Sequence, residues 1–458
     1  MAQSWQDIVR YEELLIELRE AGGEKPRYSI RLSLDDQGVE QGEFRLPLSL
    51  REIEQVLTTA SRKQWVQRAT SSDSLDPLRD MGAQLFSALF YDQRGIFYQK
   101  ALDRMERQGK GLRLRVVAGS PQLAAMPWEF LYDVYRQDFL SLSARSPVVR
   151  QLESTPAIAS PAPIAPPLSV LVVAADITAD RQRGVEQEID LLRKLGEETG
   201  LLRLDVKGAT PHKLAKALQK KPYDILHFIG AGIPLESGAG PLDLGAQALA
   251  FLNGDDDEPD DDRPYVLDGR ELATILQDAG ALRLAYLSGR QTDRLAGQIS
   301  RQVPAALGMR GMISVPACLN FTEGFYRALL TRQPLEGAVS QGRQQIDTRD
   351  PGGREWGLPT FYMRLADGAM LPQLKETAEL SALAQSSAPA TLSIESDSTR
   401  QQREKLQLHL AILKRNLDIL SQQSARYGTD TPSHIAIQID ESQRTIKGIE
   451  AELKKLGS

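Results

Sequence analysis

Side chains suited to acid–base or nucleophilic chemistry are few in this chain, which has four histidines and one cysteine among 458 residues. One histidine opens the motif His227–Gly232 (HFIGAG), which directly follows the end of an apolar run. A second motif, Leu287–Thr292 (LSGRQT), ends the next such run. In open α/β sheets, catalytic and binding residues gather where the parallel strands end. The two motifs therefore predict neighbouring strand ends that form a candidate site.

The reactive side chains near these motifs do not make a recognisable catalytic set. His227 lies four residues before Ala231, roughly 13 Å along an extended strand, and we expect it to be a satisfied core histidine. Ser288 has neither a GxSxG context nor an evident base, which argues against a serine hydrolase. Cys318 is expected at the end of a later strand, as a buried and inert thiol. A single cysteine also excludes an internal disulfide and a cysteine metal cluster.

Together with two further segments, these motifs resemble the CHAT family of caspase-type cysteine peptidases, whose active-site strand ends read HF-x-GHG and LNAC-x-[ST]. Met126–Asp133 (MPWEFLYD) resembles the PWE-x-L-y segment before the CHAT core, and residues 311–344 resemble the segment after the family's cysteine. The resemblance covers most of residues 1–370. It implies a caspase-like fold with the family's catalytic positions at two adjacent strand ends.

The sequence departs from the family at both catalytic positions. The general-base histidine of the family falls on Ala231, and its nucleophilic cysteine falls on Arg290. Alanine cannot accept a proton, and an arginine, with a pKa above about 12, stays protonated and cannot attack a carbonyl. Ser288 and Gly289 also replace the usual Asn-Ala before the nucleophile. We therefore predict a pseudopeptidase with no catalytic residue.

Arg290 has two interpretations. It could fill a pocket, capping strand-end carbonyls or pairing with an acid. Alternatively, it could bind a carboxylate of a peptide or partner, because a guanidinium forks onto carboxylates.

The pattern of apolar runs predicts an α/β fold, in which a caspase-like, mostly parallel sheet is flanked by helices. We expect strands at Leu168–Ala175, Leu201–Val206, Tyr223–Ile229, Leu282–Leu287 and Gly311–Val315, with Leu358–Leu365 closing the sheet. Helices are expected over Val185–Leu195 and from a Thr210-Pro211 start to Lys220. In the N-terminal part we expect half-buried strands at Tyr28–Leu34, Phe44–Leu46 and Gly111–Val117, and one or two helices over Leu78–Arg107.

Composition divides the chain into five regions. We expect an N-terminal α+β region over residues 1–154 and a connector over 155–167, where five prolines favour an extended segment. The caspase-like core spans 168–370. A flexible tether over 371–400, rich in small and polar residues, precedes a helical hairpin over 401–458.

The C-terminal hairpin is predicted from leucines and isoleucines at spacings of three and four. Its resemblance to short helical adaptor modules of prokaryotic conflict-system proteins favours recruitment of a partner, although it could also pack on its own domain. The predicted partner-binding residues, besides Arg290, are Leu406, Leu410, Leu413, Leu417, Tyr427, Ile435 and Ile439.

Composition also excludes several function classes. A net charge of −6 and a pI near 5.6 argue against a general nucleic-acid binder. Apolar runs are too short for a membrane helix, and the N-terminus lacks signal-peptide features, so we expect a cytoplasmic protein. The acidic run at 255–262 lacks the ligand spacing of an EF-hand and is expected to be a solvated charge run. The motif GAG does not complete GxGxxG, and no cofactor or metal is predicted.

The functional hypothesis is therefore an interaction protein. The family resemblance implies a prokaryotic defence or signalling pathway, in which the chain would act as an adaptor or as a regulatory, even inhibitory, component. Its partner would be a protein such as an active caspase-like peptidase. Two alternatives stay open: a peptidase completed by a partner, and a proteolytic target cut at 155–167 or 371–400.

Overall fold

A computed structural model describes residues 10–21, 27–34, 38–57, 77–91, 93–153, 156–175, 179–208, 210–234, 247–251, 265–277, 279–372, 443, 444, 447, 450 and 454. The chain divides into two compact units, Met1–Gln373 and Leu374–Ser458. In the second unit the five described residues are helical. The predicted partner-binding residues of the hairpin, the tether beyond residue 372 and the acidic run at 255–262 lie outside the described residues, so these predictions stay untested.

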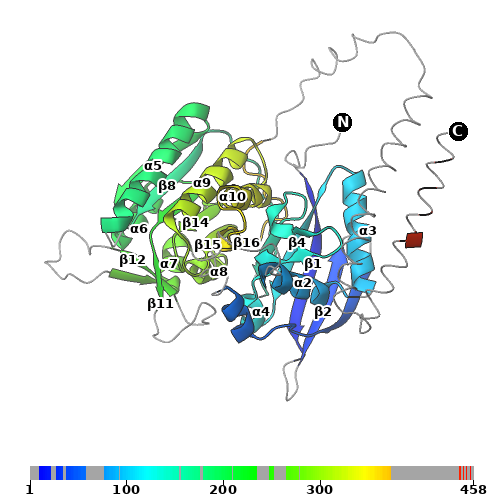
Figure 1. Ribbon diagram of the computed structural model, residues 1–458. Coiled ribbons are helices and arrows are strands. Elements are labelled where there is room, and N and C mark those ends of the chain that lie inside the picture. Colours follow the sequence, from blue (N-terminus) through cyan, green and yellow to red (C-terminus); the bar gives the residue numbers. More distant parts are fainter. Residues whose placement is uncertain are drawn as a thin grey trace, which may run out of the picture. The chain divides into compact units, whose positions relative to one another are not determined.

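One sheet of eleven described strands runs through the first unit (Figure 1). Its strand order is β3 (Gly38–Phe44), β2 (Tyr28–Leu34), β1 (Tyr11–Glu20), β4 (Gly111–Ala118), β7 (Val148–Leu152), β16 (Pro359–Met363), β15 (Ala305–Met309), β14 (Leu284–Ser288), β10 (Ile225–Ile229), β8 (Leu168–Ala174) and β9 (Leu202–Gly208). Among neighbouring strands only β1–β2, β2–β3 and β15–β16 are antiparallel. The predicted α/β class with a mostly parallel sheet is confirmed.

Helices cover both faces of the C-terminal half of this sheet. On one face α5 (Ala179–Thr199) and α9 (Val315–Leu330) pack together, and α10 (Leu335–Arg349) packs on α9. On the other face lie α6 (Pro211–Lys220), α7 (Gly269–Gln277) and α8 (Asp293–Ile299). Strand β10 shows the consequence. Ile225 packs in the hydrophobic cluster on the side of α5 and α9, and the next residue, Leu226, packs in the cluster on the side of α6, α7 and α8. A strand covered on both faces is mostly apolar, so its sequence does not alternate. The exception in β10 is the buried His227.

The remaining elements of the first unit are short or belong to its N-terminal half. The N-terminal half includes helical residues 50–57 and the helices α2 (Pro77–Leu89), α3 (Gln93–Arg107) and α4 (Pro121–Ala125). The 3-10 turns of the unit include η2 (Trp128–Phe130), η3 (Leu140–Leu142) and, towards its C-terminal end, η4 (Glu355–Gly357). Two small sheets are formed by β5 (Tyr132–Asp133) with β6 (Asp138–Phe139), and by β11 (Gly232–Pro234), β12 (Gln247–Phe251) and β13 (Tyr265–Asp268).

Helix α6 begins where the sequence predicted. Thr210 is its N-cap, and the side-chain oxygen of Thr210 accepts a hydrogen bond from the Lys213 amide at 3.1 Å. Pro211 occupies the first turn, where its missing N–H costs nothing. A local capping signal was therefore enough to place this boundary.

The prediction for the fifth strand was wrong. That strand is β15, Ala305–Met309, whereas residues 311–314 form a loop. Ser314 caps α9 by accepting a hydrogen bond from the Ala317 amide, so Cys318 lies in the first turn of a helix and not at a strand end. The run AALGM contains small residues with weak strand preference, so sequence patterning passed over it.

The sequence predicted the residues of strand β16 correctly, but it predicted the wrong position for this strand in the sheet. It does not close an edge, because it lies between β15 and β7. It thereby joins the N-terminal strands to the core strands in one sheet.

The proline-rich segment at 155–167 runs within one compact unit. The backbone amide of Ile158 donates to the Arg364 carbonyl at 2.8 Å, and the amide of Ile164 donates to the Met370 carbonyl at 2.7 Å. Both side chains are partly buried against the core. The prolines supply an extended conformation, as expected, but the segment lies along the sheet end and is attached to it.

Strand β4 was expected to be half-buried, and this was wrong. Arg113 and Arg115, which gave the strand its alternating pattern, are 3% and 1% exposed. Both guanidinium groups bind Glu13, and Arg113 also binds Glu336 of α10 at 2.7 Å. Because β4 lies inside the sheet, its charged residues are buried and paired with acids.

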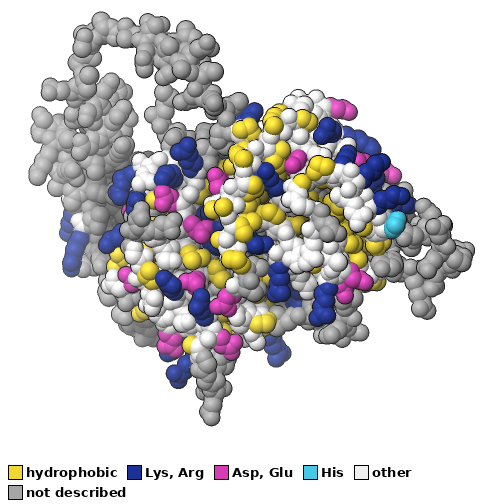
Figure 2. All heavy atoms as spheres, turned by 180° about the vertical axis from the view of Figure 1, so that it is seen from behind, with side chains coloured by type: hydrophobic (Ala, Val, Ile, Leu, Met, Phe, Trp, Pro, Cys, Tyr) yellow, Lys and Arg dark blue, Asp and Glu magenta, His cyan; other side chains and the backbone are white. Residues whose placement is uncertain are grey.

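On the face of the molecule shown in Figure 2, basic and acidic side chains are interspersed among apolar ones. No helix in the described part of the chain is both long and apolar enough to cross a membrane.

Candidate functional site

The two motif strands lie side by side, as predicted. Strands β10 and β14 are parallel, with Ile229 opposite Ser288. Backbone hydrogen bonds continue past the strand ends, from the Gly230 amide to the Ser288 carbonyl at 2.9 Å and from the Gly232 amide to the Arg290 carbonyl at 2.8 Å. The same register brings Ala231 level with Arg290. The two positions that the family pattern gives to histidine and cysteine are therefore neighbours.

Glycines allow the two strand ends to approach this closely. Gly289 has φ +149°, and a Cβ at this position would lie 1.4 Å from the Gly230 carbonyl oxygen. A Cβ at Gly232 would lie 1.8 Å from the carbonyl oxygen of Gln291. The alanine that the CHAT pattern has before its cysteine could not be accommodated at Gly289 without a backbone shift.

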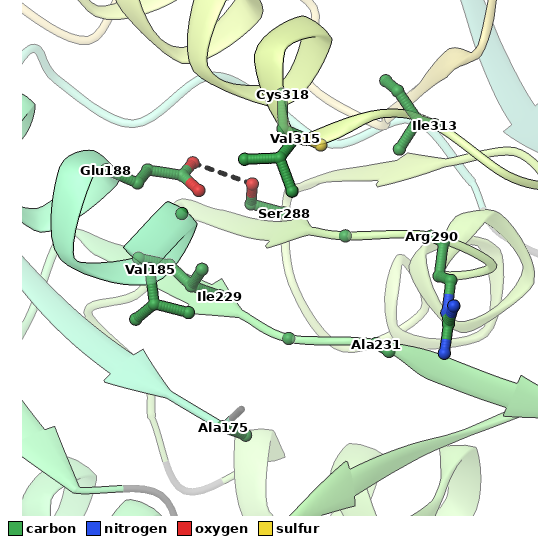
Figure 3. A pocket seen from close by; sticks show the side chains of 13 residues that line it. Ala175, Val185, Glu188, Ile229, Ala231, Ser288, Arg290, Ile313, Val315 and Cys318 are labelled. Atoms are coloured by element: carbon green, nitrogen blue, oxygen red, sulfur yellow. Dashed lines mark hydrogen bonds between the residues drawn. The ribbon is translucent and has the colours of Figure 1, made fainter. Parts of the chain in front are cut away.

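A small pocket lies beside these strand ends (Figure 3). Its volume is about 60 Å³. Its lining is mainly apolar and comes from the ends of β8, β10 and β14, from α5 and from the start of α9; the side chains include Val185, Glu188, Ile229, Ala231, Arg290, Val315 and Cys318. The two charged groups of the lining, Glu188 and Arg290, lie at opposite ends of the view in Figure 3.

Glu188 is the centre of a buried polar cluster. It belongs to α5, is 3% exposed, and receives hydrogen bonds at Oε1 from Ser288 Oγ (2.7 Å) and Thr322 Oγ1 (2.6 Å). His227 Nε2 lies 3.1 Å from the same oxygen and donates to it, while Nδ1 lies 3.0 Å from the Tyr326 hydroxyl. Three donors on three different elements therefore hold one carboxylate oxygen.

The electrostatic balance keeps this carboxylate ionised. Burial by itself raises the pKa of Glu188, but the hydrogen bond and charge of His227 and the hydroxyls of Thr322 and Ser288 outweigh it. The pKa of Glu188 consequently lies below its ordinary value of 4.5. A carboxylate with a lowered pKa is a weak base near neutral pH. Ser288, which is 2% exposed, is thus held as a donor and is not activated as a nucleophile.

The structure places the other reactive side chains as follows. His227 is fully buried and bonded at both ring nitrogens, which confirms the prediction of a satisfied core histidine. Cys318 is 8% exposed and contributes to the pocket from α9. Arg290 is half-buried, and its side chain points away from Glu188 (Figure 3). Among the described residues, no group of three or more His, Cys, Asp or Glu side chains is arranged to hold a metal ion.

Glu188 was missed in the sequence, although a signal for it exists. Helix α5 buries Ile189, Leu192 and Leu195, which predicts an apolar face over this stretch. Glu188 is four residues before Leu192, so it lies on that face. An acid on the buried face of a helix needs partners, and it therefore marks a polar cluster inside the fold.

The mostly parallel sheet, with a candidate site at the ends of two adjacent strands, defines this chain as an α/β protein. The CHAT domain family model matches residues 79–356, more than half of the chain. The chain belongs to the CHAT domain family.

Solved structures similar to the chain include two of the Saccharomyces cerevisiae separase–securin complex, at 3.0 and 2.6 Å resolution. Each has a TM-score of 0.42 and 9% identity, and the match covers 78% of this chain and 30% of that chain. This chain therefore spans about a third of the length of those solved chains. No curated protein matches the chain.

Proposed function

We propose that this CHAT-family protein has no peptidase activity and acts by binding a protein partner, as an adaptor or regulatory component. The observation that carries the proposal is the pair of neighbouring strand ends at Ala231 and Arg290. The family's two catalytic positions meet there, and neither holds a side chain that could do the chemistry.

Nearby groups do not replace the missing pair. His227 is bonded at both ring nitrogens inside the core, and Ser288 donates its proton to an ionised carboxylate. The amide of Gly232, the residue after Ala231, donates to the Arg290 carbonyl. A peptidase needs an activated nucleophile and free donors for the oxyanion. These groups already have other partners.

The integrity of the fold supports a binding role. Trp128 and Glu129 of the PWE segment are buried, and Arg150 holds both carboxylate oxygens of Glu129 at 2.6 Å. Trp128 donates its indole N–H to the Leu123 carbonyl at 3.0 Å. A chain that has lost its catalytic pair but keeps a complete buried framework is suited to recognition.

The class of partner and the pathway rest on resemblance. The C-terminal region at 401–458 resembles helical adaptor modules, so we propose that it recruits the partner. That partner is a protein of a prokaryotic defence or signalling pathway, such as an active caspase-like peptidase, which this chain would recruit or inhibit.

Affinity capture in the native host tests the adaptor role. Three baits are compared: the full chain, a chain that ends at Gln373, where the first compact unit ends, and a full-length Leu410→Asp/Leu417→Asp variant. We expect one protein to be enriched by the full chain and lost with both changed baits. Equal enrichment by all three baits would move the binding surface to the first unit. Enrichment of no protein would contradict the adaptor role.

The alternative role as a proteolytic target would use the segment at 155–167 or the one at 371–400. The first is exposed along much of its length, but Ile158 and Ile164 attach its backbone to the sheet end. A protease needs an extended stretch of backbone that can leave its hydrogen bonds. Incubation with a captured peptidase should leave 155–167 intact, and any cut should fall within 371–400.

A further inference from the structure

The carboxylate of Glu188 uses only one of its two oxygens within the described part of the chain. The hydrogen bonds from His227, Ser288 and Thr322 all end on Oε1. Oε2 belongs to a side chain that is 3% exposed and lines the pocket. Figure 3 shows this second oxygen apart from the bond to Ser288. An ionised carboxylate oxygen at the wall of a mostly apolar pocket is a strong acceptor for a donor that enters the pocket.

The pocket next to this oxygen has the size of one small group. Its volume of about 60 Å³ corresponds to roughly four to six water-sized spheres. Helices α5 and α9 approach each other closely at its wall, since a Cβ on Gly184 would lie 2.6 Å from Val315 Cγ1. Its walls are mostly carbon, contributed by Val185, Ile229 and Val315. The space suits an alkyl chain that ends in a compact polar head.

The charge in the pocket favours a cationic head. Among the described residues that line it, Arg290 is the one cationic side chain, and it points away from Glu188 (Figure 3). The groups that contact the carboxylate, two hydroxyls and the ring of His227, all bind Oε1 and leave Oε2 for another donor. A cation at Oε2 would add a charge-assisted hydrogen bond in a place shielded from water.

We propose that this pocket binds a primary ammonium group on a short alkyl chain, with Glu188 Oε2 as its anionic partner. An ammonium is a compact point charge and needs only one carboxylate oxygen. A guanidinium binds best through two parallel hydrogen bonds to both oxygens. Because Oε1 already accepts three donors, the pocket selects ammonium over guanidinium.

This chemistry has two sources, the side chain of a lysine in a protein and a free small amine. The inference does not rest on the proposed function, because a free amine would occupy the pocket whether or not the chain is an adaptor.

Titration of the full-length chain with butylammonium chloride tests the proposal, with binding followed by ligand-detected NMR. The comparison ligands are 1-butanol, which has the same chain without charge, and butylguanidinium chloride, with ionic strength held constant. We expect saturable binding of butylammonium, with a dissociation constant on the order of millimolar for so small a ligand. Both comparison ligands should bind at least about tenfold more weakly.

Two variants assign the binding to the pocket. Glu188→Gln keeps the shape of the side chain and removes its charge, and Val315→Phe fills the cavity while leaving Glu188 in place. Each should weaken butylammonium binding at least about tenfold, by loss of the charge partner or of the space. Glu197→Gln, an exposed acid on the same helix, is the control and should bind as the wild type does. Thermal unfolding shows whether each variant is folded.

Three results would overturn the proposal: no saturable binding of butylammonium, equal binding of 1-butanol, or unchanged binding in folded Glu188→Gln and Val315→Phe. If the proposal holds, N-acetyl-lysine methylamide distinguishes the sources, with the norleucine analogue as its control. Tighter binding than butylammonium would assign the site to a lysine of a protein. Weaker binding would assign it to a free amine.

Discussion

Two buried glutamates in this molecule have opposite surroundings. Glu129, in the PWE segment, is 1% exposed, and Arg150 occupies both of its oxygens at 2.6 Å. Glu188, beside the strand ends, is 3% exposed and is held at one oxygen by uncharged hydroxyls and a histidine. Glu188 also lines a pocket.

The difference separates a structural charge from a charge kept for a ligand. Where both oxygens are matched by one guanidinium, the charge is neutralised locally and fixes the backbone around it. Where one oxygen is held and the other lines a cavity, the charge is positioned but its pairing is incomplete. The pocket beside the two strand ends therefore contains a charge whose second oxygen is open to a ligand.

The largest effect is expected from a substitution that breaks the buried ion pair between Glu129 and Arg150. Arg150→Met leaves the carboxylate of Glu129 buried and unpaired, which should lower the free energy of unfolding by about 3–5 kcal/mol. Chemical denaturation of the full-length chain measures this loss of stability. Arg193→Met is the control, because Arg193 and Asp190 form an exposed pair and its removal should have no measurable effect. Equal stability of the two variants would show that the pair at Glu129 does not fix the fold.

The next effect concerns the backbone at the strand ends. Gly289→Ala should lower the free energy of unfolding by about 2 kcal/mol or more. The added Cβ would lie 1.4 Å from the Gly230 carbonyl oxygen, so the two strand ends would have to move apart. Gly280→Ala is the matched control, since a Cβ there has no neighbour within 4 Å. Unfolding curves of both variants supply the comparison. If Gly289→Ala were as stable as Gly280→Ala, the close approach of the strand ends would be contradicted.

The smallest effect is that of the charge on Glu188. In Glu188→Gln the amide oxygen can still accept the three hydrogen bonds. Near neutral pH the free energy of unfolding should therefore be only about 1 kcal/mol lower than that of the wild type. The pKa of Glu188 is lowered in the folded chain from 4.5, so its ionisation stabilises the fold above that pH. The stability advantage of the wild type over Glu188→Gln should shrink as the pH falls from about 5 towards 3. An advantage that grew over this range would mean that burial raises this pKa instead.

The fold could be predicted where local signals coincide with the structure. The continuous apolar runs at β8 and β10 and the Thr210 cap gave the right elements, because burial on both faces and capping both act within a few residues. The place of β16 could not be read in this way, since strand order depends on pairing between distant segments. Arg113 and Arg115 misled the prediction because their acids, Glu13 and Glu336, lie far away in sequence.

The candidate site was predicted in the same uneven way. Family motifs predicted the neighbouring positions Ala231 and Arg290, and the distance of His227 from Ala231 along the strand predicted that His227 is a core histidine. They could not give Glu188, whose role depends on side chains from β10, β14 and α9 that converge only in the folded chain. The glycine requirement at Gly289 was also hidden, because it arises from a contact with another strand.

The central claim is that the fold is kept without its peptidase chemistry. Incubating the full-length chain with a degenerate peptide library, and analysing the products by mass spectrometry, tests it most directly. Cys318→Ser and Ser288→Ala variants are run in parallel as matched controls. The account predicts no cleavage by any of the three proteins. Cleavage by the wild type that is abolished by either substitution would contradict it.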